Sequence, residues 1–227
     1  MYQLENVTKV YRGPRGPVTA LDDVSLTVED GEWVAVTGPT GGGKSTLLQL
    51  LGALDRPASG TVRFGSGDTT AQLDRLPERA LTSLRARRIG FVFQSFNLIP
   101  TLSALDNVVA ALRPLGVGGG AARERAAAAL DAVGLGDRAD HVPGMLSGGQ
   151  QQRVAVARAL VKDPDVLLAD EPTGNLDERM RDEIVSLFAS VWADRGVTVV
   201  MVTHDSRLAR RAGRTVHLAD GRLRPGA

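Results

Sequence analysis

The segment Gly38-Pro39-Thr40-Gly41-Gly42-Gly43-Lys44-Ser45-Thr46 decides how the rest of the chain is interpreted. It matches the phosphate-binding pattern of glycine, four residues, glycine, lysine and Ser or Thr. An apolar run of strand length, residues 33–37, precedes it, and a predicted helix, residues 45–51, follows it. Glycines allow the backbone to turn with positive φ and to bring N–H groups against phosphate oxygens, and the helix start adds its positive dipole end. The segment therefore predicts a nucleoside-triphosphate site.

The use of lysine in this chain supports a special role for Lys44. Lys9, Lys44 and Lys162 are the only lysines among 27 basic residues. In a chain so rich in arginine, lysine indicates a position where a compact charge is needed, here along the β- and γ-phosphates. The Ser45 hydroxyl is then predicted to coordinate Mg²⁺. The alternative, a glycine-rich linker with a chance lysine, is disfavoured because linkers rarely lie between a buried strand and an apolar helix.

Composition limits the classes of protein that need to be considered. A length of 227 residues suits one large domain, or a domain with a lobe, and 43% apolar with 23% charged residues is typical of globular proteins. A net charge of +1 does not favour a nucleic-acid surface. The lack of cysteine excludes disulfides and thiolate chemistry and is compatible with a reducing cytoplasm. No apolar run approaches the ~18 residues of a membrane span, so we expect membrane contact only through a partner.

The order of the predicted elements indicates an α/β core with an inserted helical lobe. Residues 1–30 predict short antiparallel strands that lead into the strand at 33–37. Between Ser95 and about Gly144 only helical patterns occur, including a helix that the capping box of Ser103 and Asp106 opens. The other predicted elements are strands at 61–64, 89–93, 166–169, 197–202 and 215–218, and helices at 73–88, 103–112, 121–133, 150–161 and 179–195.

Several of the predicted strands end in polar residues. The strand at 33–37 ends in the phosphate loop, the strand at 89–93 ends in Gln94, and the strand at 166–169 ends in Asp170 and Glu171. The strand at 197–202 is followed shortly by His204. Since sites in open parallel sheets collect at the carboxyl edge of the strands, we expect these groups to converge on one γ-phosphate.

The stretch Leu146-Ser147-Gly148-Gly149-Gln150 matches the signature of one family. With this signature the chain resembles the nucleotide-binding subunit of an ATP-binding-cassette (ABC) transporter. Other motifs of that family occur in the expected order: the phosphate loop, Gln94, the acidic end of the strand at 167–171, Asn175-Leu176-Asp177 and His204. The resemblance implies an α/β fold: a RecA-like phosphate-loop core with a mixed, mostly parallel sheet, an N-terminal antiparallel β subdomain and an inserted α-helical subdomain. It implies one domain over residues 1–227, with core and β subdomain at about 1–94 and 155–227 and the helical lobe at about 95–154.

The resemblance also implies two cofactors, ATP and Mg²⁺, and a role for each matching residue. Asp170 would hold Mg²⁺ through water beside Ser45 and Gln94, which are hard oxygen ligands as well. Glu171 would polarise the attacking water. The alternative for the acidic pair is a solvated strand end, but a carboxylate directly after an apolar run is costly without a purpose. His204 would contact the γ-phosphate, whereas a lone histidine is more often structural.

Two further positions acquire a role through the same resemblance. Tyr11 falls where the family places the aromatic side chain that stacks on adenine; its alternative is a half-buried strand aromatic. Ser147 is a natural N-cap, so the helix behind it points its positive end outward. In the family this end meets the γ-phosphate that a second subunit binds. Two chains would thus sandwich two ATP molecules, with Ser147 to Gln150 and Asp177 at the seam, and hydrolysis would reopen the ATP-dependent homodimer.

Within the family the chain looks most similar to the group of lipoprotein-release and macrolide-export ATPases. That group implies an integral membrane permease with few membrane helices and a large outer domain, and a cytoplasmic position on the inner face of the cell membrane. We expect residues 94–105 and the helical lobe to contact the permease. Thr40 and Gly42 stand where serine is common. The alternatives are a soluble ABC ATPase that acts on nucleic acid or ribosomes, and a phosphate-loop kinase, in which Ser147 to Gln150 would have no task.

Overall fold

The computed structural model describes residues 1–14 and 16–224, except for the side chain of Asp68. The chain forms two compact units: unit 1 contains Met1–Thr82 and Thr198–Ala227, and unit 2 contains Ser83–Val197. The boundary at Thr82 lies inside helix α2 (Glu78–Arg88). The helical lobe expected at 95–154 stays a prediction about domain organisation. Within the described residues, no helix is both long and apolar enough to span a bilayer.

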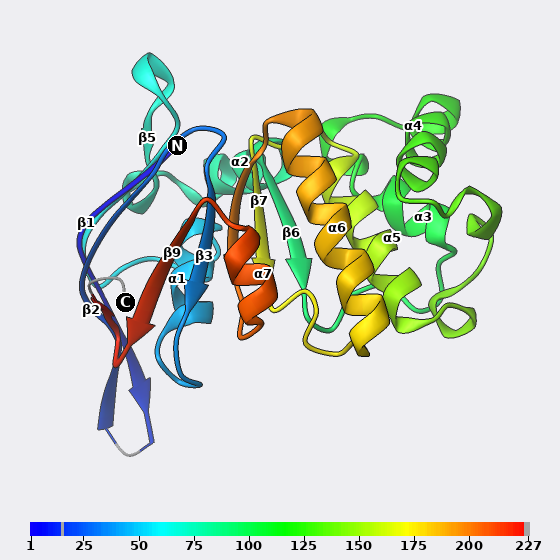
Figure 1. Ribbon diagram of the computed structural model, residues 1–227. Coiled ribbons are helices and arrows are strands. Elements are labelled where there is room, and N and C mark those ends of the chain that lie inside the picture. Colours follow the sequence, from blue (N-terminus) through cyan, green and yellow to red (C-terminus); the bar gives the residue numbers. More distant parts are fainter. Residues whose placement is uncertain (15, 225–227) are drawn as a thin grey trace. The chain divides into compact units, whose positions relative to one another are not determined.

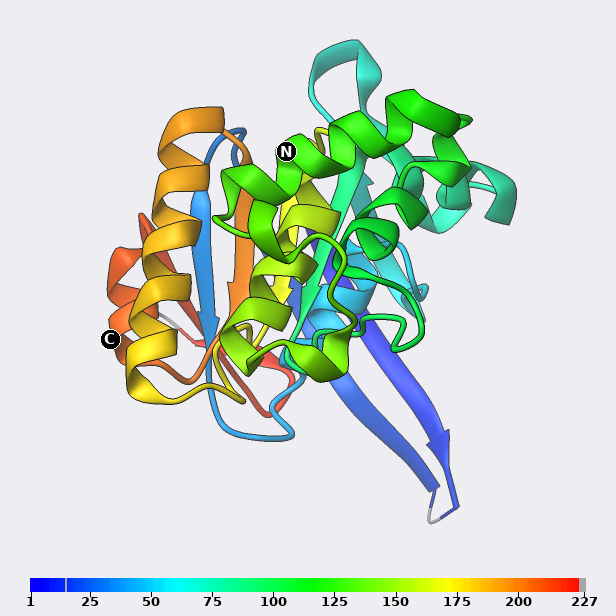
Figure 2. The ribbon, with the colours of Figure 1, turned by 90° about the vertical axis from the view of Figure 1, so that its right-hand side faces the viewer.

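Unit 1 begins with a long hairpin that belongs to an antiparallel sheet. The sheet order is β2-β1-β4-β5, with β1 (Tyr2–Gly13), β2 (Gly16–Val28), β4 (Ser59–Phe64) and β5 (Ala71–Gln72). The strands of the hairpin have 12 and 13 residues and extend away from the other strands of unit 1 (Figure 1, Figure 2). Several register shifts interrupt the pairing of β1 with β2. Because each bulge adds an unpaired residue, the apolar alternation is broken, which is why the sequence predicts short strands here.

A second set of strands in unit 1 carries the phosphate loop. Its order is β10-β9-β3-β8, with β3 (Trp33–Thr37), β8 (Thr198–Val202), β9 (Arg214–Ala219) and β10 (Arg222–Arg224). β3 pairs in parallel with both β8 and β9, and β10 is antiparallel to β9, so the sheet is mixed, as the sequence predicts. Every residue of β8 is buried, which explains its continuous apolar run.

The antiparallel sheet packs against α1 (Lys44–Leu51), the helix that follows the phosphate loop. The rings of Tyr2 and Phe64 are fully buried, with centroids 4.9 Å apart. The Tyr2 hydroxyl donates to the Leu51 carbonyl over 2.8 Å, which ties β1 to the end of α1. A short helix, α7 (Ser206–Arg211), contacts β3.

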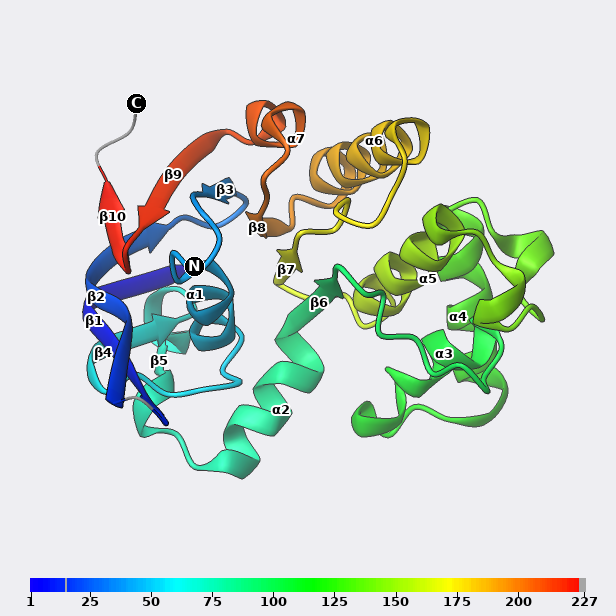
Figure 3. The same ribbon diagram turned by 90° about the horizontal axis from the view of Figure 1, so that it is seen from below.

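Unit 2 combines two parallel strands with a group of helices. The strands are β6 (Ile89–Phe93) and β7 (Val166–Asp170), and the helices after α2 are α3 (Ala104–Ala110), α4 (Gly119–Ala132), α5 (Gly148–Leu160) and α6 (Glu178–Arg195). α5 packs on β6, and α3, α4 and α5 contact one another (Figure 3). The alanine-rich α4 buries Ala122, Ala126 and Leu130, which lie four residues apart on one face. The helical subdomain is thereby confirmed.

Two predicted helices are shorter in the structure, and a proline accounts for each difference. The helix expected at 103–112 ends at Ala110, and a 3₁₀ turn around Pro114, Arg113–Leu115, follows. The stretch expected at 73–88 splits into a 3₁₀ turn, Leu73–Arg75, and α2, with Pro77 between them. Proline lacks the N–H that an uninterrupted helix needs, and it disfavours helical backbone at the preceding residue.

Candidate nucleotide site

The phosphate loop joins β3 to α1 in unit 1, and its glycines are needed for its shape. Gly38 has φ +142°, and a Cβ there would lie 1.9 Å from the Leu218 carbonyl oxygen. Gly43 has φ +99°, and a Cβ there would lie 2.3 Å from the Ala20 carbonyl oxygen. Only glycine fits positions that combine positive φ with such close backbone approach. The loop is therefore held between β9 and β2.

Lys44 is almost buried at the start of α1, with 6% of its surface exposed. Its ammonium group donates to the carbonyls of Gly38, over 2.9 Å, and Pro39, over 2.8 Å. These bonds fold the side chain back over the loop. α1 itself begins at Gly43 with no side-chain cap and no acidic residue in its first turn. The loop therefore offers an anion one lysine and a helix start whose first turn contains no acidic residue.

The other residues of unit 1 predicted for the site lie near this loop or at the same sheet edge. Ser45 is exposed and Thr46 half-buried in the first turn of α1. His204 is exposed and follows β8, the parallel neighbour of β3. The Thr203 N–H donates to the Val36 carbonyl over 3.1 Å, which keeps the end of β8 level with the phosphate loop. Tyr11 lies on β1 and is 36% exposed.

In unit 2, the ends of β6 and β7 bring together Gln94, Asp170 and Glu171. β6 and β7 are parallel, and Phe93 lies opposite Asp170 in their register. Gln94 and Asn175 bind each other twice: the Gln94 side chain donates to Asn175 Oδ1 over 3.1 Å, and Asn175 Nδ2 donates to the Gln94 carbonyl over 3.0 Å. Sequence reasoning noted Asn175 only as part of a motif. Its contact with Gln94 is visible only once the strands are paired.

Glu171 has an unusual backbone conformation. Its φ is +44°, in the left-handed region that residues other than glycine rarely occupy, and the buried Pro172 follows it. The Glu171 carbonyl accepts a hydrogen bond from the Gly174 N–H over 2.9 Å, which closes the turn. Non-glycine residues held in this region cost free energy and cluster at functional sites. The strain supports a functional role for Glu171.

The signature residues Ser147, Gly148, Gly149 and Gln150 form the first turn of α5. Ser147 is the N-cap: its Oγ accepts from the Gln150 N–H over 3.3 Å, and Gln150 Oε1 accepts from the Ser147 N–H over 2.9 Å. This reciprocal capping box confirms the N-cap that the sequence predicts. The Gly149 N–H is paired with Met180 Sδ over 3.3 Å. A thioether is a weak acceptor, so a phosphate oxygen would be a stronger partner for this N–H.

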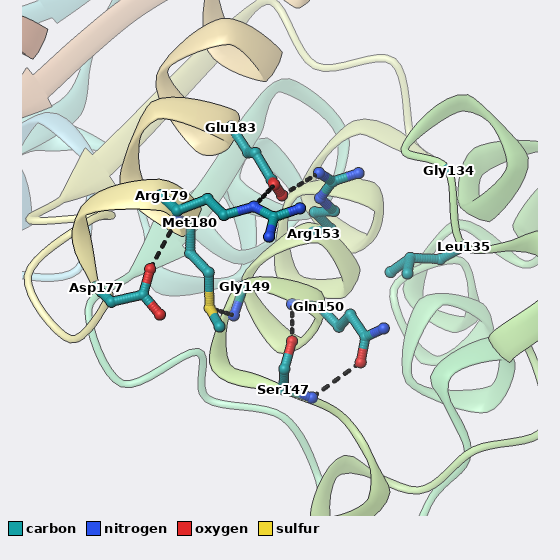
Figure 4. Close-up of a pocket in the computed structure, with 10 residues that line it drawn as sticks. All are labelled: Gly134, Leu135, Ser147, Gly149, Gln150, Arg153, Asp177, Arg179, Met180 and Glu183. Atoms are coloured by element: carbon teal, nitrogen blue, oxygen red, sulfur yellow. Dashed lines mark hydrogen bonds and ion pairs between the residues drawn. The ribbon is translucent and has the colours of Figure 1, made fainter.

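A hollow of about 530 Å³ in unit 2 joins the start of α5 to the start of α6 (Figure 4). Asp177, the N-cap of α6, accepts from the Met180 N–H over 2.9 Å and lies on the rim together with Ser147. On the far side Arg153 forms an ion pair with Glu183 at 2.7 Å. The hollow is lined by Gly134, Leu135, Ser147, Gly149, Gln150, Arg153, Asp177, Arg179, Met180 and Glu183. Two helix starts thus border one open hollow.

The predicted site residues therefore form three groups, one in unit 1 and two in unit 2. Unit 1 holds Tyr11, the phosphate loop with Lys44, and His204. Unit 2 holds the strand-end group around Gln94 and the signature group around Ser147. The roles of these residues, and their convergence on one nucleotide, stay predictions.

A phosphate loop between a parallel strand and a helix defines a nucleotide-binding protein of the phosphate-loop class. The comparison with family models narrows this class: residues 21–174 match the model described as ABC transporter. The chain belongs to the ABC transporter family.

Relatives agree with this assignment. The chain is 49% identical, over 98% of its length and 97% of the relative's, to the lipoprotein-releasing system ATP-binding protein LolD of Geobacter metallireducens. It is 45% identical, over 99% of its length, to the macrolide export ATP-binding/permease protein MacB of Syntrophobacter fumaroxidans, but it spans only 31% of that protein. The fold is also similar to a solved structure of the ATP-binding cassette MJ0796, a dimer in a post-hydrolysis state bound to ADP and Pi. The TM-score is 0.90 and the sequence identity 43%, and the match covers 99% of this chain and 97% of the MJ0796 chain.

These findings confirm the predicted fold and the predicted class of function. The chain is an ABC ATPase of the kind found in transporters, similar to the LolD and MacB ATP-binding proteins. The alternatives, an ABC ATPase that acts on nucleic acid or ribosomes and a phosphate-loop kinase, find no support among these relatives.

Proposed function

We propose that two copies of this chain bind two ATP molecules with Mg²⁺ between them and hydrolyse them to drive an integral membrane permease. The observation that carries the proposal is the hollow beside Ser147. The capped start of α5 borders this open hollow in unit 2, whereas the phosphate loop leads into α1 in unit 1. The dimer of the similar cassette MJ0796, with ADP and Pi, supports the same arrangement for this chain.

In this scheme the phosphate loop binds the triphosphate. N–H groups of the loop and of the first turn of α1 donate to phosphate oxygens, and Lys44 moves from its two carbonyl partners to the β- and γ-phosphates. Tyr11 stacks on the adenine. The nearly buried position of Lys44 reduces the solvent screening of its charge, which strengthens its attraction to the anion.

Ser45, Gln94 and Asp170 are the residues that would hold Mg²⁺. All three offer oxygen ligands, and Gln94 and Asp170 lie at the ends of paired strands, so the donor set suits this ion. The described part of the chain has no group of three or more acidic or histidine side chains placed for a metal. Such a group is not needed, because Mg²⁺ usually keeps several waters and binds one or two carboxylates together with substrate phosphates. The bound ion neutralises charge on the phosphate oxygens.

Glu171 and His204 would act on the attacking water. Glu171 accepts a hydrogen bond from the water and orients it in line with the γ-phosphorus, and its constrained backbone limits the directions that the carboxylate can take. His204 contacts the γ-phosphate. The partner's Ser147 and Gly149 donate to the same phosphate from the start of α5, so the pocket is complete only when two chains close.

The permease is proposed to bind the loop between β6 and α3. Arg158 donates to the carbonyls of Phe96 and Asn97, and the buried Asn107 binds both backbone groups of Ile99. The loop is thus held in one shape while the Ile99 side chain remains 45% exposed. A loop held in one shape needs less ordering when a partner binds, which suits a docking surface, and the Ile99 side chain would add an apolar contact there.

The relatives suggest the kind of system in which the chain works. LolD is named for lipoprotein release and MacB for macrolide export, and MacB is named as both ATP-binding protein and permease. We infer a permease with few membrane helices and a large outer domain, a cargo such as a lipoprotein, lipid, peptide or drug, and a cytoplasmic position on the inner face of the cell membrane. Nucleic acid is not among the proposed partners.

The experiment that tests this function uses Glu171→Gln. The substitution removes the charge that polarises water but keeps the size of the side chain, so ATP should stay bound and the dimer should accumulate. Light scattering with ATP should report a dimer, and phosphate release should fall by at least about a hundredfold. Glu124→Gln, the same change at an exposed position on α4, is the matched control and should behave as wild type. A Glu171→Gln protein that stays monomeric with ATP yet retains turnover would contradict the proposal.

A further inference from the structure

The Tyr11 hydroxyl ties β1 to the helix that follows the phosphate loop. It lies 3.2 Å from Gln49 Oε1 on α1 and 3.0 Å from Asp55 Oδ2 in the turn after α1. Burial raises the pKa of Tyr11, the Thr46 hydroxyl lowers it, and Asp55 raises it again. The net shift is upward, so the phenol keeps its proton near neutral pH and remains a donor. The ring is therefore fixed relative to α1, the helix that begins at the loop.

Lys9 holds the same ring through the same carboxylate. Its ammonium group donates to Asp55 Oδ1 over 2.6 Å and to the Arg56 carbonyl over 2.7 Å. It also lies 4.9 Å from the centroid of the Tyr11 ring, which is within the range of a cation–π contact. One carboxylate thus connects lysine and tyrosine, with one oxygen on each. The Lys9 side chain is only 12% exposed, so solvent screens the ion pair with Asp55 less than a surface pair.

This arrangement leaves only one face of the Tyr11 ring on which a flat ligand can stack. An aromatic ring has two faces, and the ammonium group of Lys9 lies over one of them. Tyr11 as a whole nevertheless remains 36% exposed. A base that stacks on Tyr11 must use the opposite face, at a height and tilt that the hydroxyl contacts to Gln49 and Asp55 determine.

We propose that Lys9 and Asp55 are positioning residues that hold Tyr11 in the orientation needed to stack on the base of ATP. The inference rests on the proposed role of Tyr11 in binding adenine. Neither residue touches the nucleotide in this account. They act by reducing the freedom of the ring before the base arrives, so that less ordering is needed on binding.

A purely structural role for the pair leads to a different expectation. Asp55 Oδ1 also accepts from the Arg56 N–H over 2.7 Å, so the carboxylate helps to close the turn after α1. If this were its whole task, its replacement would lower thermal stability and would weaken every ligand of the site equally. A positioning role predicts a loss only for ligands that carry a base.

The test compares equilibrium binding of ATP and of inorganic triphosphate, which lacks the base. Tyr11→Ala should weaken ATP binding roughly fivefold to a hundredfold, the effect of losing one base–aromatic stack. Asp55→Asn, which keeps an acceptor for the turn but loses the charge, should weaken it by roughly threefold to tenfold, as should Lys9→Met. Affinity for triphosphate should be unchanged in all three. Asp22→Asn, which breaks the ion pair with Arg222 on β2 and β10, is the matched control and should alter neither affinity.

The outcomes separate this inference from the function on which it rests. Asp55→Asn combined with Tyr11→Ala should bind ATP no more weakly than Tyr11→Ala alone, because the pair acts through the ring. If Tyr11→Ala leaves ATP affinity unchanged, the proposed stacking is wrong, and the positioning role with it. If Tyr11→Ala weakens ATP but Asp55→Asn and Lys9→Met do not, or if ATP and triphosphate weaken together, the positioning role alone is overturned. Melting curves of each variant establish that the comparison is made on folded protein.

Discussion

Replacing Asn107 by alanine should destabilise the protein more than any exposed substitution near it. Asn107 lies on α3 and is fully buried. Its side chain accepts from the Ile99 N–H over 2.7 Å and donates to the carbonyls of Ile99, Leu102 and Ser103 over 3.0 to 3.1 Å. One amide therefore holds both ends of the turn that leads into α3. Alanine supplies none of these bonds.

The expected size of the effect follows from the number of groups that lose a partner. Each buried polar group left unpaired costs about 1–3 kcal/mol. The Ile99 and Ser103 carbonyls keep their bonds from the Leu102 and Asn107 N–H groups, so the two groups that depend on the side chain are the Ile99 N–H and the Leu102 carbonyl. Since the Ile99 side chain is exposed and water can approach the turn, the loss of both bonds should lower the free energy of unfolding by about 2–4 kcal/mol. For a chain of this length that corresponds to a fall in melting temperature of roughly 5–15 °C.

The assay is thermal and urea unfolding followed by circular dichroism. Asn107→Asp keeps the acceptor for the Ile99 N–H but loses both donor hydrogens, so it should be less stable than wild type as well. Crosslinking of the loop to the permease, where the partner is present, should also weaken in Asn107→Ala. A melting temperature within about 2 °C of wild type would show that Asn107 does not fix the loop.

Two further predictions concern stability and the phosphate loop. Burial, and then the charge of Arg158, lowers the pKa of Lys162 from 10.5 to about 8. Between these values the unfolded chain binds more protons than the folded one, so the free energy of unfolding should rise with pH across this window by about 3 kcal/mol. Lys162→Met should remove this rise in urea titrations. Gly43→Ala should weaken ATP binding by at least about tenfold, because φ is +99° and the new Cβ would meet the Ala20 carbonyl. Gly120→Ala in α4, where a Cβ would find open space, is the control and should leave ATP binding unchanged. Calorimetry that gives the Gly43→Ala protein the same affinity for ATP as wild type would contradict this prediction.

The sequence predicts the elements of the core well where apolar runs are continuous. The strands expected at 33–37 and 89–93 have the same bounds in the structure, because each is a buried run that ends at a glycine-rich loop or a polar residue. The antiparallel strands predicted in residues 1–30 are present, but β1 and β2 are longer than predicted, because bulges break the apolar alternation. The phosphate loop and the Ser147 cap could be recognised because their residues are adjacent along the chain.

Contacts between distant residues could not be predicted in this way. Lys9 and Asp55 are 46 positions apart, and Gln94 and Asn175 are 81 apart. No periodicity or local spacing connects such pairs. They meet only because side chains of β1 reach α1 and the turn after it, and because β6 pairs with β7. The supports of the site, unlike its motifs, therefore became visible only in the folded chain.

The most direct test of the two-chain pocket mixes two inactive variants. Lys44→Ala removes the phosphate-binding lysine, and Ser147→Arg places a bulky side chain at the start of α5. When copies of the two pair, one of the two pockets combines an intact phosphate loop with an intact Ser147. The account predicts that the mixture hydrolyses ATP although neither variant does so alone. A mixture as inactive as its components, with paired chains demonstrated by light scattering, would contradict the claim that each pocket is shared between two chains.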